Sequence, residues 1–376
     1  MKKRQRPLSS RLVLAAISVL GVSALYWTGC GTEDQAPVSA PNRTQFTEEL
    51  NYANPRVQAT MAVQDRHTAD IMQDNNVVGT ATGVADDGTM VIKVYLREAA
   101  GTRDYIAELE GVPVEYEVTG QFTAFKGGGG GGGSDPKVKQ TPPIKLGTSG
   151  GWRYDLANGY CCGGTLGALV LKGGNQYVLS NYHVLEADIV NGGNSRVAQA
   201  GDPVIQPGLI DVNCTAANAQ NVATLSGIKS LPNSNTDCAI AQVTPGMVST
   251  TGEILNIGTL SATTQAASLG QAVKKMGRTT GLTRSSVSGL NASVSVAYEN
   301  ECAGGSAFTK TYSGQIVIAN SGSRFLAGGD SGSLLVQDVT TNPRAVGLLF
   351  AGSSSAAIAN PIGQVLSFLG ASMVGN

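Results

Sequence analysis

The stretch Gly-Gly-Asp-Ser-Gly-Ser at residues 328–333 decides how the rest of the chain is interpreted. A nucleophilic serine must lie on a tight turn whose backbone N–H groups face the negative charge that develops on the reacting oxygen. Gly329 leaves room for that approach, and Gly332 lets the chain leave the turn without a side-chain clash. We therefore consider Ser331 a candidate nucleophile and the N–H groups of Gly329 and Ser331 a candidate oxyanion hole. The plainer alternative is a glycine-rich hairpin turn.

A serine hydroxyl needs a base before it can attack at neutral pH. His183 is the one histidine in the sequence after residue 134. It lies in Val-Leu-Ser-Asn-Tyr-His-Val-Leu, residues 178–185, where an apolar strand is expected to end in polar residues. Sites are often built at such strand ends. Alone, the residue would fit a buried structural histidine, but together with the serine turn it is the expected general base.

The imidazole needs an acidic partner that orients it and balances its charge. Asp237 opens the apolar segment Asp-Cys-Ala-Ile-Ala, so we expect it at a rigid position on the edge of the core. Asp211, within Leu-Ile-Asp-Val, is the alternative. The other acidic residues between the histidine and the serine are weaker candidates: Glu186, Asp188, Asp202, Glu253, Glu299, Glu301 and Asp330.

Seven consecutive glycines at residues 127–133 divide the chain. Such a run cannot pack a core and is typical of a flexible linker, so residues 127–142 are assigned to a Gly-rich linker. Residues 143–376 consist of short runs of β-branched and small residues bounded by Gly, Asn or Pro, a pattern that predicts an all-β barrel or sandwich. Helices are expected there only near His183 and at residues 362–369.

Residues 46–126 are expected to form a small α+β module. Apolar residues recur near helical spacing from Phe46 to about Asp74, although Pro55 interrupts the pattern. Two β-rich runs flank an Asp-Gly turn at residues 87–88 and predict a hairpin. Another run, residues 112–118, alternates like a further strand. The module carries no catalytic set, and its position suggests either an inhibitory or folding-assisting pro-region or a permanent binding or anchoring domain.

The N-terminus is typical of an export signal. A basic start is followed by an apolar run from Leu12 to Trp27, which is short for a membrane span and suits a signal peptide. The run ends at Thr-Gly-Cys-Gly, which resembles a bacterial lipoprotein signal with Cys30 as the lipid attachment site and point of membrane attachment. We expect residues 1–29 to be a signal peptide and residues 30–45 a disordered tether. Ordinary cleavage and an uncleaved anchor are the alternatives, and all three export the chain to the cell envelope or the medium.

Composition limits the partners. Charged residues make up 14% of the chain, the net charge is −1, and no basic stripe occurs, so a nucleic acid is not expected as a partner. The six cysteines suit an exported protein. With Cys30 lipidated, the remaining five predict two disulfides and one free thiol. Because no Cys-x-x-Cys pair or histidine cluster occurs, neither a metal nor another cofactor is expected.

Five motifs follow one another along the chain in an order that is informative. They are Gly-Gly-Thr-Leu-Gly-Ala-Leu-Val (163–170), Ser-Asn-Tyr-His-Val-Leu (180–185), Thr-Asp-Cys-Ala-Ile-Ala (236–241), Gly-Arg-Thr-Thr-Gly-Leu-Thr (277–283) and Gly-Asp-Ser-Gly-Ser (329–333). Together they resemble the chymotrypsin-like (trypsin-fold) serine proteases of bacterial type. The resemblance implies a double β-barrel in residues 143–376 and a monomeric serine endopeptidase that cleaves polypeptides through an acyl-enzyme. Two alternatives remain open: a catalytically silent binding module of the cell envelope and an esterase-type acyl hydrolase.

The resemblance also implies a structural ion pair. Bacterial members of the family pair the acid before the serine with an internal basic side chain near the Gly-Arg-Thr-Thr-Gly motif. In this sequence the acid is Asp330, and its implied partner is Lys275, with Arg278 as the alternative.

The primary specificity pocket is implied in the same way. The residue six before the serine, Phe325, is placed at the base of this pocket, and Phe350 and Gly352 are placed on a second wall. Because no acidic residue occurs at these positions, the resemblance implies an apolar or small residue at P1 of the substrate.

Overall fold

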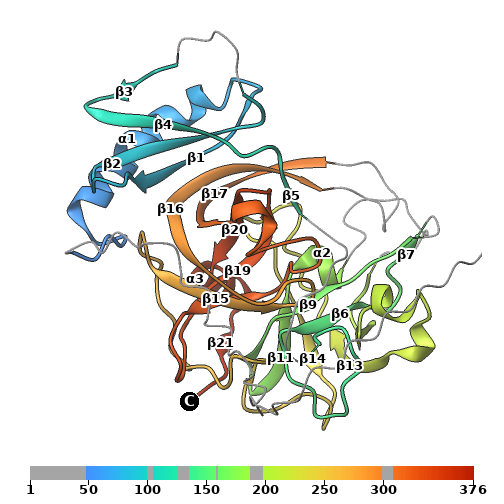
Figure 1. Ribbon diagram of the computed structural model, residues 1–376. Helices are drawn as coiled ribbons and strands as arrows, with labels where there is room; N and C mark the ends of the chain where they lie inside the picture. The colour runs from blue at the N-terminus through green and yellow to red at the C-terminus, as the bar shows by residue number, and fades with distance from the viewer. Residues whose placement is uncertain (1–47, 100–104, 125–134, 158–159, 187–197, 299–307) are drawn as a thin grey trace, which may run out of the picture. The chain divides into compact units, whose positions relative to one another are not determined.

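The computed structural model describes residues 48–99, 105–124, 135–157, 160–186, 198–298 and 308–376 (Figure 1). The expected signal peptide, Cys30, the tether and the glycine run at 127–133 lie outside these ranges, so they stay predictions. All the described residues belong to one compact unit, Ala40–Asn376.

Six strands near the C-terminal end close into a barrel. Neighbouring strands pair in the order β15-β18-β19-β20-β17-β16, and β16 returns to β15, so the ring is complete. Pairing around the ring is antiparallel. The strands are β15 (Ala272–Gly277), β16 (Gly281–Tyr298), β17 (Phe308–Ala319), β18 (Leu334–Gln337), β19 (Ala345–Gly352) and β20 (Ala356–Pro361).

A first barrel closes through a strand that is interrupted at Gly167. Its two parts are β9 (Gly164–Leu166), which pairs with β6, and β10 (Ala168–Lys172), which pairs with β11. The path from β11 through β14, β13 and β12 to β6 completes the ring of this first barrel. The remaining strands are β6 (Thr148–Trp152), β11 (Asn175–Ser180), β12 (Pro203–Gln206), β13 (Gln220–Leu225), β14 (Ala239–Val243) and β21 (Ser372–Met373), which adds to β10.

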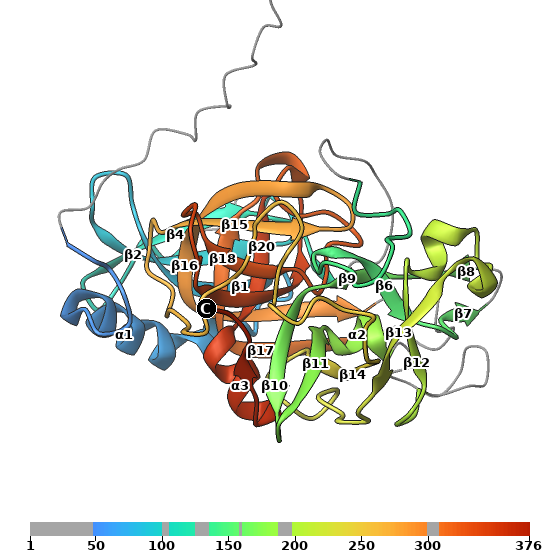
Figure 2. The same cartoon turned by 90° about the horizontal axis from the view of Figure 1, so that it is seen from below.

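The chain is therefore an all-β protein with the chymotrypsin-like double β-barrel that the sequence predicts. Figure 2 shows the strands of the first barrel, in green to yellow, beside those of the second, in orange to red. One apolar cluster contains buried residues of both, including Leu169 and Ile240 from the first barrel and Val317 and Leu348 from the second. The barrels thus share a continuous core. The short elements outside the rings are β7 (Leu156–Ala157), β8 (Tyr160–Cys161), α2 (Tyr182–Leu185), α3 (Ile362–Leu369) and the 3-10 turns η1 (Leu209–Val212), η2 (Ala216–Asn218) and η3 (Ser321–Ser323).

The N-terminal residues form a helix on a small set of strands. Helix α1 begins at Pro55 and ends at Ile71, so Pro55 starts the helix rather than interrupting it. Proline suits the first helical position because the N–H that it lacks would have no partner there. The side chain of Asn54 caps the helix by accepting from the backbone N–H groups of Arg56 and Val57.

The expected hairpin is present, and it joins the second barrel. Its strands are β1 (Val77–Val84) and β2 (Met90–Leu96), with β4 (Val112–Val118) parallel to β2 and β3 (Glu108–Leu109) beside β4. Strand β1 pairs antiparallel with β16, so the module and the barrel share one sheet (Figure 1). Strand β5 (Phe122–Ala124) pairs parallel with β16 and, through Thr123, antiparallel with Gly352 at the end of β19.

The cysteines form at least one disulfide, which joins Cys161 to Cys214. Cys162 is also disulfide-bonded, and Cys238 is a buried free thiol. Within the described ranges, no helix is both long enough and apolar enough to cross a membrane.

Candidate active site

The serine turn is held between the two barrels. The backbone N–H and the hydroxyl of Thr165, in β9, donate to the carbonyl oxygens of Ser331 and Gly329, at 2.9 and 3.0 Å. Gly332 has a φ of +91°, and a Cβ there would lie 2.2 Å from the Ser180 hydroxyl and 2.3 Å from the carbonyl oxygen of Thr165. Only glycine therefore allows this approach. The turn belongs to the second barrel, but hydrogen bonds from the first barrel hold it in place.

Ser331 and the segment of His183 meet at one point of the fold. A Cβ on Gly164 would lie 2.6 Å from the Val184 side chain and 2.9 Å from the Ser331 carbonyl oxygen, so both residues border that glycine. Ser331 is 2% exposed, and its hydroxyl donates to the carbonyl oxygen of Phe350 at 3.3 Å. The nucleophile candidate therefore lies next to the helix that carries the candidate base.

His183 and Asp237 are in direct contact. The imidazole Nδ1 lies 2.5 Å from Asp237 Oδ2, and the His183 backbone N–H donates to Oδ1 at 3.2 Å. Facing a carboxylate, Nδ1 carries the proton, which leaves the lone pair on Nε2. Among the described residues Nε2 has no hydrogen-bond partner. The backbone of Asp237 is fixed on both sides, because its N–H donates to Asn360 and its carbonyl oxygen accepts from Asn181.

Asp211, the alternative acid in the sequence, lies in another network. Its two carboxylate oxygens accept from Nε and Nη2 of Arg278, each at 2.6 Å, and this fork geometry is a strong one. The Ser149 hydroxyl donates to the same carboxylate at 2.5 Å. The structure thus brings Asp237 to His183, and it brings Asp211 to Arg278.

Asp330 and Lys275 form a fully buried ion pair. Lys275 Nζ lies 3.1 Å from Asp330 Oδ2, and both side chains are 0% exposed. The carboxylate also accepts from the backbone N–H groups of Ala327, Thr279 and Thr280 at 2.8–3.1 Å. The bonds from Thr279 and Thr280 tie the residue before Ser331 to the loop between β15 and β16. Arg278, the other basic candidate, is not the partner.

The three expected pocket residues are mostly buried. Phe325 is 3% exposed and packs in an apolar cluster, and its carbonyl oxygen accepts from the hydroxyls of Thr280 and Thr283. Phe350 is 0% exposed, its ring lies edge-on to Tyr312, and its carbonyl oxygen accepts from the Ser331 hydroxyl. Gly352 pairs with Thr123 of β5. Strand β5 therefore pairs with one of the residues that the resemblance assigns to substrate binding.

Sequence reasoning missed Tyr298. Its hydroxyl donates to Asp237 Oδ2 at 2.9 Å, and the two residues are far apart along the chain. Tyr298 is the last residue of β16, and no local motif marks it as a partner of an aspartate in the other barrel. The alternating pattern of β16 could have identified it as an inward-facing position, but not its contact.

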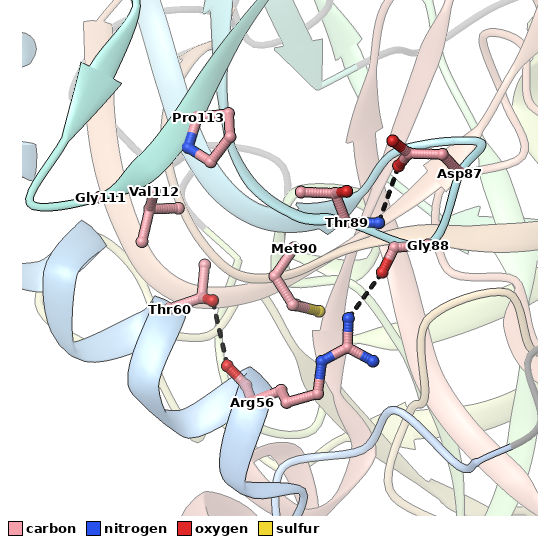
Figure 3. Close-up of a pocket in the computed structure, with 9 residues that line it drawn as sticks. All are labelled: Arg56, Thr60, Asp87, Gly88, Thr89, Met90, Gly111, Val112 and Pro113. Carbon is pink, nitrogen blue, oxygen red and sulfur yellow. Dashed lines mark hydrogen bonds between the residues drawn. The ribbon is translucent and has the colours of Figure 1, made fainter.

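A hollow of about 530 Å³ lies elsewhere, in the N-terminal module between α1 and the turns before β2 and β4 (Figure 3). Its one basic side chain, Arg56, already pairs with Glu48 at 2.6 Å and donates to the carbonyl oxygen of Gly88 at 2.6 Å. The other lining residues are Thr60, Asp87, Thr89, Met90, Gly111, Val112 and Pro113. Among the residues that the structure covers, no group of three or more His, Cys, Asp or Glu side chains could hold a metal ion.

Comparison with known proteins gives one matching family and several similar solved structures. The family described as "Nal1 C-terminal domain" matches residues 230–360. A glutamic acid specific serine protease is 20% identical with a TM-score of 0.40, over 61% of this chain and 100% of its own. Thermobifida fusca Protease A is 20% identical with a TM-score of 0.40, over 62% and 99%. Cellulomonas bogoriensis chymotrypsin is 20% identical with a TM-score of 0.37, over 56% and 91%. No curated protein matches the sequence.

Proposed function

We propose that this protein is a serine endopeptidase in which Ser331 is the nucleophile, His183 the general base and Asp237 the residue that orients the base. The observation that carries the proposal is the 2.5 Å contact between His183 Nδ1 and Asp237 Oδ2 beside the glycine-flanked serine turn. A structural histidine would have no need of a buried carboxylate on one nitrogen and an unpartnered lone pair on the other.

The proposed reaction has two halves. His183 Nε2 takes the proton of the Ser331 hydroxyl as Oγ adds to the carbonyl carbon of the substrate, and Asp237 stabilises the resulting imidazolium. The N–H groups of Gly329 and Ser331 stabilise the oxyanion. The imidazolium then gives its proton to the leaving amine, which produces an acyl-enzyme. In the second half a water molecule, deprotonated by His183, hydrolyses the ester and restores Ser331.

We further propose an apolar or small P1 residue. The apolar ring of Phe325 and the absence of a side chain at Gly352 support this, because neither offers a charge to a basic or acidic substrate side chain. Comparing the kcat/KM values of peptides with Phe, Ala, Arg or Glu at P1 tests it. A preference for Arg or Glu would overturn the specificity and leave the triad untouched.

The N-terminal module is proposed to be an inhibitory pro-region. Support comes from β5, whose Thr123 pairs with Gly352 and whose Phe122 is fully buried, so that an extended segment of the same chain covers the edge proposed for substrate. Extended peptides bind by adding a strand to such edges. Thr123→Pro removes the N–H of a strand that has neighbours on both sides and should weaken its pairing.

One experiment on the full chain tests these proposals together. A fluorophosphonate probe should label Thr123→Pro at least about tenfold faster than wild type, because a proline disrupts β5. Thr123→Val keeps the backbone N–H and should match wild type, and Ser331→Ala should not be labelled. Equal rates for wild type and Thr123→Pro would reject inhibition by β5.

The same preparations separate the candidate functions. We expect the labelled protein to cleave casein and the Ser331→Ala variant to leave it intact. No labelling in any variant would favour a silent binding module. Labelling without casein cleavage would favour an acyl hydrolase.

Export is proposed from the basic and apolar N-terminal segment alone. With Cys30 as a lipid attachment site, the protein should fractionate with membranes, and Cys30→Ala should release it. If both forms stay in the cytoplasm, the signal assignment is wrong.

A further inference from the structure

From the described residues, the Asp237 carboxylate, which is 0% exposed, accepts three hydrogen bonds. Oδ1 accepts from the His183 backbone N–H, and Oδ2 accepts from His183 Nδ1 at 2.5 Å and from the Tyr298 hydroxyl at 2.9 Å. Of these donors, only the Tyr298 hydroxyl comes from outside the histidine. The Tyr298 hydroxyl donates to Oδ2, the same oxygen that contacts the imidazole.

The hydroxyl reaches Asp237 from the opposite barrel. Asp237 precedes β14 of the first barrel, whereas Tyr298 ends β16 of the second. The Tyr298 ring also contacts the imidazole edge-on, with centroids 5.9 Å apart and an angle of 72° between the planes. The Phe308 ring also stacks on the Tyr298 ring, with centroids 4.8 Å apart. One side chain thus contacts both members of the histidine–aspartate pair and is itself held between neighbours.

A second tyrosine sets the direction of this hydrogen bond. The hydroxyl oxygens of Tyr298 and Tyr312 are 2.5 Å apart. Because Tyr298 uses its proton to donate to Asp237, its oxygen has to accept, so Tyr312 is the donor of the second bond. The Tyr312 ring lies edge-on to Phe350, whose carbonyl oxygen accepts from Ser331. Tyr312 therefore extends the chain of contacts back to the candidate nucleophile.

Both hydroxyls stay protonated in this environment. Burial first, and the negative charge of Asp237 second, raise the pKa of Tyr298 and of Tyr312 well above the usual range. In the described part of the chain, the other titratable groups that interact with Asp237 are Tyr182 on α2 and the adjacent Cys238. Lys310 lies over the Tyr312 ring. Asp237 has no basic partner other than His183 among the described ion pairs. Donors to its charge must therefore be neutral hydroxyl or N–H groups.

We propose that Tyr298 is a positioning residue for the histidine–aspartate pair, and that Tyr312 orients Tyr298. The inference rests on the proposed serine hydrolase function. Tyr298 fixes Oδ2 from the second barrel, so the imidazole keeps its orientation toward a serine that belongs to that same barrel. It acts through Asp237 Oδ2 and through its edge-on contact with the imidazole ring, and it takes no part in proton transfer itself.

Kinetics on the full chain, with and without Thr123→Pro, test the proposal. Tyr298→Phe should lower kcat about tenfold and leave KM within about twofold, because it removes one bond to a charged group without touching substrate. Tyr312→Phe acts one bond further away and should lower kcat about threefold. Tyr95→Phe is the matched control: Tyr95 is 1% exposed, its hydroxyl has no partner in the described structure, and its variant should keep the wild-type kcat.

A spectroscopic readout separates positioning from folding. The Nδ1 proton between His183 and Asp237 should give a low-field proton resonance, which Tyr298→Phe shifts and Tyr95→Phe leaves in place. This measurement does not need turnover, and it still works if Tyr298→Phe is inactive. A chain that fluorophosphonate labels neither as wild type nor as Thr123→Pro rejects the function. A labelled wild type with unchanged kcat and resonance in Tyr298→Phe rejects this inference alone.

Discussion

The buried ion pair behind the serine turn gives the sharpest prediction, through the substitution Lys275→Met. Methionine keeps much of the volume but removes the ammonium group 3.1 Å from Asp330, and both side chains are 0% exposed. Breaking a buried ion pair by removing one partner costs about 3–5 kcal/mol, because a charge is left uncompensated. Three backbone N–H groups still donate to Asp330, so we expect the low end, about 3 kcal/mol.

The neighbouring lysine provides the control. Lys274 is 5% exposed, and its Nζ donates to the carbonyl oxygen of Val339 at 2.7 Å, but it has no buried acidic partner among the described ion pairs. Lys274→Met should therefore lower the free energy of unfolding by only about 1 kcal/mol. Urea unfolding of wild type and the two variants measures the difference.

The Lys275→Met substitution should affect the serine turn as well as the stability of the fold. Asp330 holds the turn of Ser331, so Lys275→Met should also lower the fraction of protein that fluorophosphonate can label, measured under conditions where the variant is folded. Lys274→Met should keep the full fraction. If the two variants lose equal stability and both label completely, the ion pair does not position the turn and our reasoning fails.

Two further predictions concern stability. Burial raises the pKa of the Glu186 carboxyl to about 7, so between its unfolded value of 4.5 and 7 the unfolded chain releases a proton that the folded chain keeps. The free energy of unfolding should therefore fall by about 3 kcal/mol as pH rises through this window. Urea unfolding at pH 4.5 and at pH 8 measures this fall, and Glu186→Gln should abolish it. A variant with the same pH slope as wild type would contradict this. The Cys161–Cys214 disulfide spans 53 positions, and replacing both cysteines by serine should lower the free energy of unfolding by about 4 kcal/mol. Unchanged thermal unfolding on replacement would contradict the loop-entropy argument.

Local patterns were sufficient for much of the fold. Runs of β-branched residues between glycines predict the strands, and the Asp-Gly turn predicts the hairpin of β1 and β2. They could not predict that β1 continues the sheet of the second barrel, because strand pairing between distant segments leaves no signature in either segment. Pro55 shows a similar limit at short range, because a proline in a helical pattern is compatible with either the start or an interruption of a helix.

The sequence by itself determined the glycine-flanked serine turn, its order after His183 and an aspartate, and the all-β class, because each depends on neighbouring residues and on backbone freedom. Only the tertiary structure decided that Asp237 rather than Asp211 contacts His183, and that Lys275 rather than Arg278 pairs with Asp330. It alone placed Tyr298 on Asp237 and β5 on Gly352. The physical reason is that the packing of the two barrels determines which distant charges and hydroxyls are buried together. A buried polar group without water is unfavourable unless it is hydrogen-bonded, so each of these groups pairs with a neighbour that the fold places beside it.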